Sequence, residues 1–121
     1  MHDVRPAAVA GMFYPDATAR LAAAVRGYLA AVAPDTGDPP KAVIVPHAGF
    51  VYSGPVAASA YARLAALRGR VTRVLLLGPT HRVAVRGLAL PRAHAFATPL
   101  GEVPIDAAAV AQARALPQVV V

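Results

Sequence analysis

The 121-residue chain contains no cysteine and no tryptophan, and aromatic residues make up only 6% of it. Without cysteine the chain forms no disulfide and offers no thiolate as a nucleophile or metal ligand. No apolar run approaches the roughly 20 residues that a helix needs to cross a bilayer. These absences exclude a disulfide framework and cysteine-dependent catalysis within this chain, and they predict no membrane association.

Residues 1–11 lack a basic region followed by an apolar core, so the sequence does not begin with a secretory signal peptide. We therefore expect a soluble, cytoplasmic protein. Hydrophobic residues make up 57% and charged residues 15%, far from the profile of a disordered chain. This length and composition predict a single domain over residues 1–121 with one core.

Acidic residues are scarce: six Asp and Glu stand against twelve Lys and Arg, for a net charge of +6. A basic balance can indicate nucleic-acid binding, but the arginines are scattered. The densest group is Arg63, Arg68, Arg70 and Arg73. No polybasic run, zinc-finger spacing or aromatic stacking pattern is present, so we interpret the arginines as solvated surface charge and expect no nucleic-acid partner.

The centre of the sequence predicts an α/β fold. Residues 41–45 and 72–78 are short apolar runs of the kind that form buried strands. Between them, residues 55–67 show helical spacing and begin with Pro55, a residue that suits a first helical turn. Strand, helix and strand in this order predict a right-handed βαβ unit with parallel strands.

Flanking segments add further elements to this prediction. Asp16 should cap a helix over residues 17–33, and Asp106 should cap a second over 107–115. Residues 83–90 read as a third strand, and the final Val-Val-Val reads as the start of another. Because that hydrophobic terminus is abrupt, we expect the fold to be incomplete and the chain to be a truncated part of a longer protein.

Two histidines follow the two central strands at matching positions. His47 comes directly after Val45-Pro46, and His81 follows Gly78-Pro79-Thr80. The carboxyl ends of parallel strands share one edge of a sheet, and neighbouring strands lie about 4.8 Å apart. Two imidazoles there could bind one metal ion at about 2.1 Å, although both could equally be polar or hydrogen-bonded loop residues.

A catalytic metal usually takes a third protein ligand, often a carboxylate. The available acids are Asp3, Asp16, Asp35, Asp38, Glu102 and Asp106, and none follows a third predicted strand. Ser53 could belong to a Ser-His-acid relay, but it lacks the G-x-S-x-G elbow and is better explained as the N-cap of the next helix. His94, in an extended segment, is interpreted as a surface residue.

Four motifs occur in order along the chain: "RPAAVAGMFYP", "PHAGFVYSGPVAASAY", "LGPTHRV" and "TPLGEVPID". Together they resemble the N-terminal half of the Memo family, whose microbial members are called AmmeMemoRadiSam system protein B. The resemblance implies a three-layer αβα sandwich with a parallel core, similar to the class III extradiol dioxygenases. It also implies that His47 and His81 are ligands of iron or copper, and the system name implies a link to a radical SAM protein.

The chain departs from the family pattern at two places near this rim. Phe50 stands where the family usually has tyrosine, and Arg82 replaces the second histidine of the paired motif. Family members are also roughly twice as long, so the third metal ligand is expected in a segment that this chain lacks.

The leading functional hypothesis is therefore a Memo-like protein with a non-haem iron or copper site and a redox or dioxygenase-like role. Small and polar residues at the rim would line the ligand pocket, namely Gly49, Tyr52, Ser53, Thr80 and Arg82. One alternative is a non-catalytic module that binds anionic or phosphorylated peptides through Arg82 and Arg86. Another is a fragment without activity of its own. A half-sheet with exposed apolar edges also predicts a homo-oligomer.

Overall fold

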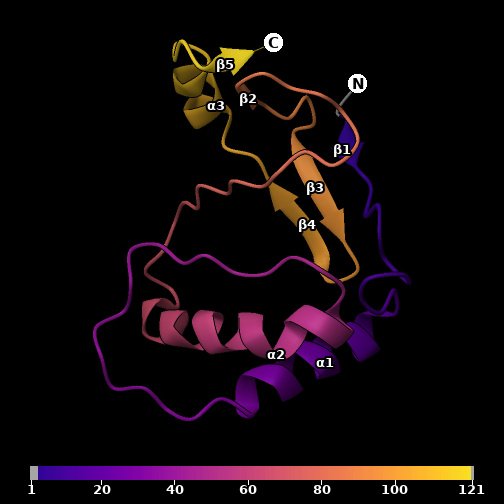
Figure 1. The fold of residues 1–121 in the computed structure, drawn as a ribbon, viewed down its shortest axis with the longest axis vertical. Helices are drawn as coiled ribbons and strands as arrows, with labels where there is room; N and C mark the ends of the chain where they lie inside the picture. Colours follow the sequence, from indigo (N-terminus) through magenta and orange to yellow (C-terminus); the bar gives the residue numbers. More distant parts are fainter. Residues whose placement is uncertain (1–2, 121) are drawn as a thin grey trace. The chain divides into compact units, whose positions relative to one another are not determined.

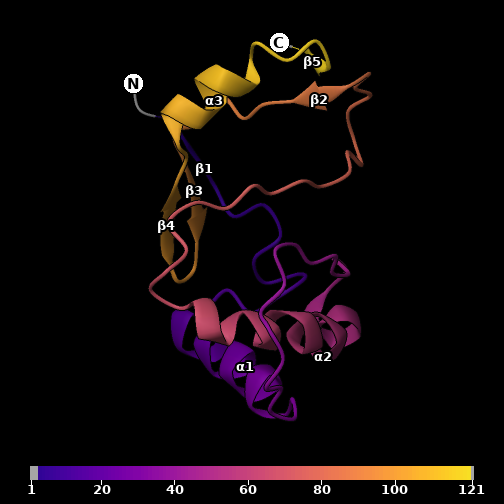
Figure 2. The same ribbon diagram turned by 90° about the vertical axis from the view of Figure 1, so that its left-hand side faces the viewer.

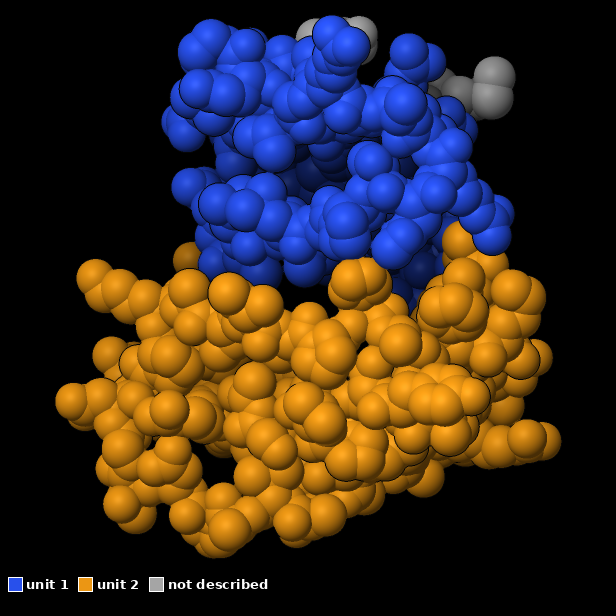
Figure 3. All heavy atoms as spheres, in the orientation of Figure 1, with its two compact units in different colours: residues 1–7, 73–121 blue, residues 8–72 orange. Residues whose placement is uncertain are grey.

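The computed structural model describes residues 3–120, in which the chain divides into two compact units (Figure 3). Unit 1 combines residues 1–7 with residues 73–121, and unit 2 is the continuous stretch 8–72. None of the helices within the described residues is both long enough and apolar enough to span a membrane.

Unit 2 is built from two α-helices that pack against each other, α1 (Thr18–Ala30) and α2 (Phe50–Tyr61), and a 3₁₀ helix, η1 (Ala62–Leu67), that continues α2 (Figures 1 and 2). The helix predicted over 17–33 is confirmed in shorter form. Its N-cap is Ala17, with no side-chain cap hydrogen bond, so the prediction that Asp16 caps it is wrong.

Helix α2 begins earlier than its sequence predicts. The N-cap is Gly49 rather than Ser53, which lies within the helix, so the N-cap interpretation of Ser53 is wrong. Pro55 therefore sits inside the helix, where its missing N–H leaves the carbonyl of Val51 without its helical partner. The Val51 side chain is exposed, so this turn faces water, which can satisfy the carbonyl.

The contact between α1 and α2 contains the most deeply buried residues of unit 2. Leu21 of α1 and Ala58 of α2 are buried, and so are Ser53 and Gly54 on the same helix. A Cβ placed on Gly54 would come within 2.7 Å of Cε2 of Tyr28. The two helices thus approach at a glycine, because only a residue without a side chain leaves room for the tyrosine ring.

Unit 1 contains a three-stranded sheet in the order β1-β3-β4, formed by β1 (Val4–Arg5), β3 (Ala95–Thr98) and β4 (Gly101–Pro104). Strand β1 runs parallel to β3, and β4 returns antiparallel to it. Thr98 closes the β3–β4 turn, because its Oγ1 accepts from the N–H of Leu100 at 3.1 Å and donates to the carbonyl of Gly101 at 2.9 Å.

A second, smaller sheet in unit 1 pairs β2 (Leu88–Ala89) with β5 (Val119–Val120) in parallel. The strand predicted over 83–90 is thus reduced to two residues. The final strand is confirmed at Val119–Val120, and its last predicted residue, Val121, lies outside the described residues. Helix α3 (Ala107–Ala113) precedes it.

The predicted N-cap of α3 is confirmed. Oδ1 of Asp106 accepts a hydrogen bond from the N–H of Ala109 at 2.9 Å.

The two central strands predicted from the sequence do not form. Residues 41–45 and 72–78 are extended but belong to no strand, so the predicted parallel βαβ unit is wrong for this structure. An apolar run becomes a strand only when another backbone offers it hydrogen bonds, and no described segment does so here. The mixed α/β class is confirmed, with parallel pairing at β1–β3 and β2–β5 instead.

Candidate functional site

His47 lies in unit 2, in the segment without secondary structure that leads to α2. Its side chain is exposed, and Ile44 just before it is fully exposed, at 100%. His47 therefore lies at the surface two residues before the N-cap of α2, and the strand that was expected to precede it is absent.

The N-terminus of α2 is tied to the preceding loop. The N–H of Phe50 donates to the carbonyl of Phe13 at 2.7 Å, and the carbonyl of Gly49 accepts from the N–H groups of Tyr52 and Ser53 at 2.9 Å. A side chain at Gly49 would contact the Phe13 backbone at 3.5 Å. The backbone after His47 is thereby fixed close to residues that lie more than thirty positions earlier in the sequence.

An aromatic groove of about 300 Å³ lies beside this helix start. The Phe50 ring meets Tyr14 at 5.7 Å between centroids and Tyr28 edge-on at 6.1 Å. Asp16 and Arg20 supply charge at the same groove. Sequence reasoning did not assign these residues to a site, although the aromatic run "AGMFYP" was the available signal.

The predicted pocket-lining residues of this segment differ in exposure. Tyr52 is 81% exposed, whereas Ser53 is only 5% exposed. Tyr52 is thus accessible to a ligand at the surface, and Ser53 contributes to the packing between α1 and α2.

His81 lies in unit 1, in a bend that follows the extended run 72–78. Thr80, His81 and Arg82 are all exposed. The preceding apolar side chains are exposed as well, Leu75 at 86% and Leu76 at 77%. The local pattern of this segment matches that of His47: an extended apolar run, a proline and a surface histidine.

His47 and His81 belong to different units, so the common metal site remains a prediction. Among residues 3–120, no group of three or more His, Cys, Asp or Glu side chains is placed to hold a metal ion. The two imidazoles are suitable donors for iron or copper, but two donors alone fall short of the three protein ligands typical of a catalytic site.

Two ion pairs fix arginines of the predicted basic surface. Arg63 Nε lies 2.8 Å from Asp35 Oδ2 in unit 2, and Arg73 Nε lies 2.6 Å from Asp106 Oδ2 in unit 1. The pKa of Asp106 is lowered, first by the hydrogen bond from the Ala109 N–H and further by the charge of Arg73. These contacts assign two of the arginines to structural roles.

Comparison with known proteins identifies the class to which this mixed α/β chain belongs. The family model described as Memo-like protein matches residues 5–120, so the chain belongs to the Memo-like family. A MEMO1 family protein of Schizosaccharomyces pombe is 35% identical over 103 residues, which cover 85% of this chain and 32% of the relative.

Two further relatives show the same level of similarity. A MEMO1 family protein of Pyrobaculum arsenaticum is 36% identical over 110 residues, covering 85% of this chain and 39% of the relative. Protein MEMO1 of Danio rerio is 38% identical over 102 residues, covering 84% and 33% respectively. The chain thus spans about a third of the length of the curated relatives that it matches.

Proposed function

We propose that His47 and His81 are two protein ligands of a non-haem iron or copper centre in a Memo-like protein with a redox or dioxygenase-like role. The supporting observation is a repeated local arrangement in a chain that belongs to this family. In both segments an apolar run without secondary structure ends in a proline, and an exposed histidine follows. A three-layer αβα sandwich in a chain of the relatives' length is part of the same proposal.

The chemistry of the residues present fits such a centre in part. Neutral imidazole suits iron and copper, and a bound metal would supply Lewis acidity and one-electron chemistry. Because residues 3–120 hold no three-donor group, at least one further ligand must come from outside them or from solvent. Full coordination is therefore proposed for a chain of the relatives' length, of which this sequence spans about a third.

Residues beside the two histidines have roles of their own in this proposal. The fixed positive charge of Arg82, next to His81, attracts an anionic ligand. The exposed hydroxyl of Tyr52 can hydrogen-bond to a bound oxygen-containing molecule. Gly49 and Thr80 leave backbone groups accessible near the two histidines, and Ser53 supports the helix that follows His47.

The test is metal binding by the full chain and by histidine variants. The protein would be titrated anaerobically with Fe(II) and separately with Cu(II), and bound metal measured after gel filtration. We expect His47→Ala and His81→Ala each to weaken binding at least tenfold. His94→Ala is the matched control, because His94 is also an exposed histidine and lies outside the two segments that the proposal assigns to the metal. Equal metal content in the wild type and the double variant His47→Ala/His81→Ala would overturn the ligand assignment.

The same protein can test the binding-module alternative. Arg82 and Arg86 are exposed and form no ion pair within the described part of the chain, so their donors are available to an anion. Binding of a phosphorylated peptide that survives loss of both histidines but fails in Arg82→Ala would favour this alternative over the metal centre.

A further inference from the structure

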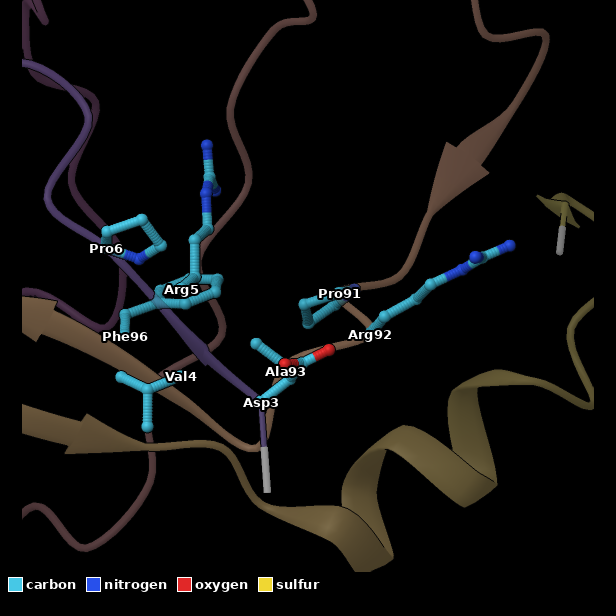
Figure 4. A pocket seen from close by; sticks show the side chains of 8 residues that line it. All are labelled: Asp3, Val4, Arg5, Pro6, Pro91, Arg92, Ala93 and Phe96. Carbon is cyan, nitrogen blue, oxygen red and sulfur yellow. The ribbon is translucent and has the colours of Figure 1, made fainter. Parts of the chain in front are cut away.

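A groove of about 500 Å³ lies within unit 1, between β1 and residues 91–93, the segment that leads toward β3 (Figure 4). It contains none of the residues assigned to the metal proposal. Two arginines line it, Arg5 from β1 and Arg92 from the segment 91–93. Figure 4 shows the two side chains extending from different backbone segments, with Pro91 between them.

Backbone pairing fixes the two sides of this groove relative to each other. In the parallel β1–β3 register, Val4 is opposite Ala95 and Arg5 is opposite Phe96. The N–H of His94 also donates to the carbonyl of Asp3 at 2.9 Å, which extends the pairing by one residue. Ala95 of β3 is buried, at 3% exposure, so the strand that pairs with β1 is anchored in the small core of unit 1.

Arg5 is held in place by an aromatic ring rather than by a carboxylate. Its guanidinium carbon lies 5.2 Å from the centroid of the Phe96 ring, a cation–π contact. Within residues 3–120 neither Arg5 nor Arg92 forms an ion pair. The Arg5 guanidinium is thus positioned while its N–H donors remain available, and such a planar fork matches the two oxygens of a carboxylate.

Apolar walls and one acid narrow the class of ligand. Pro6, Pro91 and Phe96 line the groove and offer apolar surface to the body of a ligand. The two prolines have no backbone N–H to donate. Asp3 lines the groove too, and its carboxylate offsets one of the two arginine charges. One negative charge on a ligand is therefore balanced by the groove, whereas a second would be repelled by Asp3. A ligand with a single carboxylate therefore matches the charges of the groove better than a doubly charged phosphate does.

We propose that this groove binds a small monocarboxylate with an apolar body, whose oxygens pair with Arg5 and whose body lies against Phe96 and the prolines. Arg92, on a flexible and exposed stem, adds a second positive charge over the bound anion. The site is independent of the metal proposal, because no residue is shared between them.

The experiment uses three anions on the full chain: benzoate, acetate and inorganic phosphate. Binding would be followed by shifts of the backbone amides of residues 3–5 and 93–96 in two-dimensional NMR. We expect saturable binding of benzoate, at least fivefold tighter than that of acetate or phosphate. Tighter binding of phosphate than of benzoate would overturn the proposed ligand class.

Variants locate the site and keep the test decisive. Arg5→Gln should weaken benzoate binding about tenfold and Arg92→Gln about threefold, whereas Arg114→Gln, at the end of α3 and outside the groove, should leave it unchanged. Asp3→Asn should tighten phosphate binding, since it removes the opposing charge. If Arg5→Gln fails to fold, Arg92→Gln still decides: an effect no larger than that of Arg114→Gln overturns the proposal.

Discussion

Replacing Gly54 by alanine tests the packing of α1 against α2. The added Cβ would lie 2.7 Å from Cε2 and 2.8 Å from Cζ of Tyr28, well inside van der Waals contact. The ring cannot simply turn away, because Tyr28 packs edge-on against Phe50 at 6.1 Å and its hydroxyl donates to the Phe50 carbonyl at 3.4 Å. Relief of the overlap therefore requires the helices to separate or the ring contacts to be lost.

The expected magnitude combines two opposing effects. Overpacking a core site costs about 1–3 kcal/mol, whereas exchanging glycine for alanine inside a helix gains about 1 kcal/mol. Because the added Cβ would lie only 2.7 Å from a ring that is held by Phe50, the overpacking cost falls in the upper part of that range, about 2–3 kcal/mol, and we expect Gly54→Ala to lower the free energy of unfolding by roughly 1–2 kcal/mol. Gly27→Ala is the matched control in α1, since no atom lies within 4 Å of its added Cβ, and it should stabilise by about 0.5–1 kcal/mol.

Urea-induced unfolding followed by far-UV circular dichroism would measure both variants. A double variant, Tyr28→Ala combined with Gly54→Ala, identifies the cause. In the Tyr28→Ala background the added alanine should no longer destabilise the protein. The coupling energy between the two sites should therefore be opposite in sign to the destabilisation caused by Gly54→Ala alone. A Gly54→Ala protein as stable as the wild type would refute the close helix approach described above.

Three shorter predictions concern unit 1. Gly87→Ala should lower the urea midpoint, because Gly87 has φ of +104° and an added Cβ would overlap the carbonyl oxygen of Gln118, which accepts from the Leu88 N–H. Asp106→Ala should also lower the free energy of unfolding. Because the folded-state pKa of Asp106 lies below the ordinary 3.8, the difference in unfolding free energy from wild type should be full above pH 3.8 and should vanish as the pH falls through the folded-state pKa. Leu75→Glu should leave the unfolding midpoint unchanged, because the side chain is 86% exposed. If the run 72–78 joins two copies of the chain, the same variant should reduce self-association in sedimentation velocity. Unchanged self-association would refute that homo-oligomer proposal.

The sequence predicted best those features that depend on neighbours along the chain. The Asp106 cap is confirmed because a carboxylate reaches an N–H three residues later without help from the rest of the fold. The start of α2 was misplaced because the N–H of Phe50 is satisfied by Phe13, a distant partner that local propensity does not reveal. The β3–β4 hairpin was not predicted, although its Thr98 and Gly101 form a compact turn.

The prediction that residues 41–45 and 72–78 form strands was wrong, again because the outcome depends on a partner that is distant in the sequence. An apolar run carries the side chains of a buried strand, but the hydrogen bonds must come from another segment. The candidate metal site has the same dependence, because each histidine follows its own run and the pattern of one segment cannot specify where the other lies. Family membership, by contrast, followed from motifs whose order is printed in the sequence, and it is confirmed.

The pairing of Val4 with Ala95 determines the order in which the two units can be completed during synthesis. Unit 2 is continuous, so all of its residues have been translated before the strand that β1 requires. Unit 1 must then close a loop of roughly ninety residues, whose length-dependent entropic cost is about 4 kcal/mol if the intervening chain is flexible. A helical unit 2 that has already folded shortens the flexible path, so damage to α1 or α2 should slow the assembly of a sheet to which neither helix belongs.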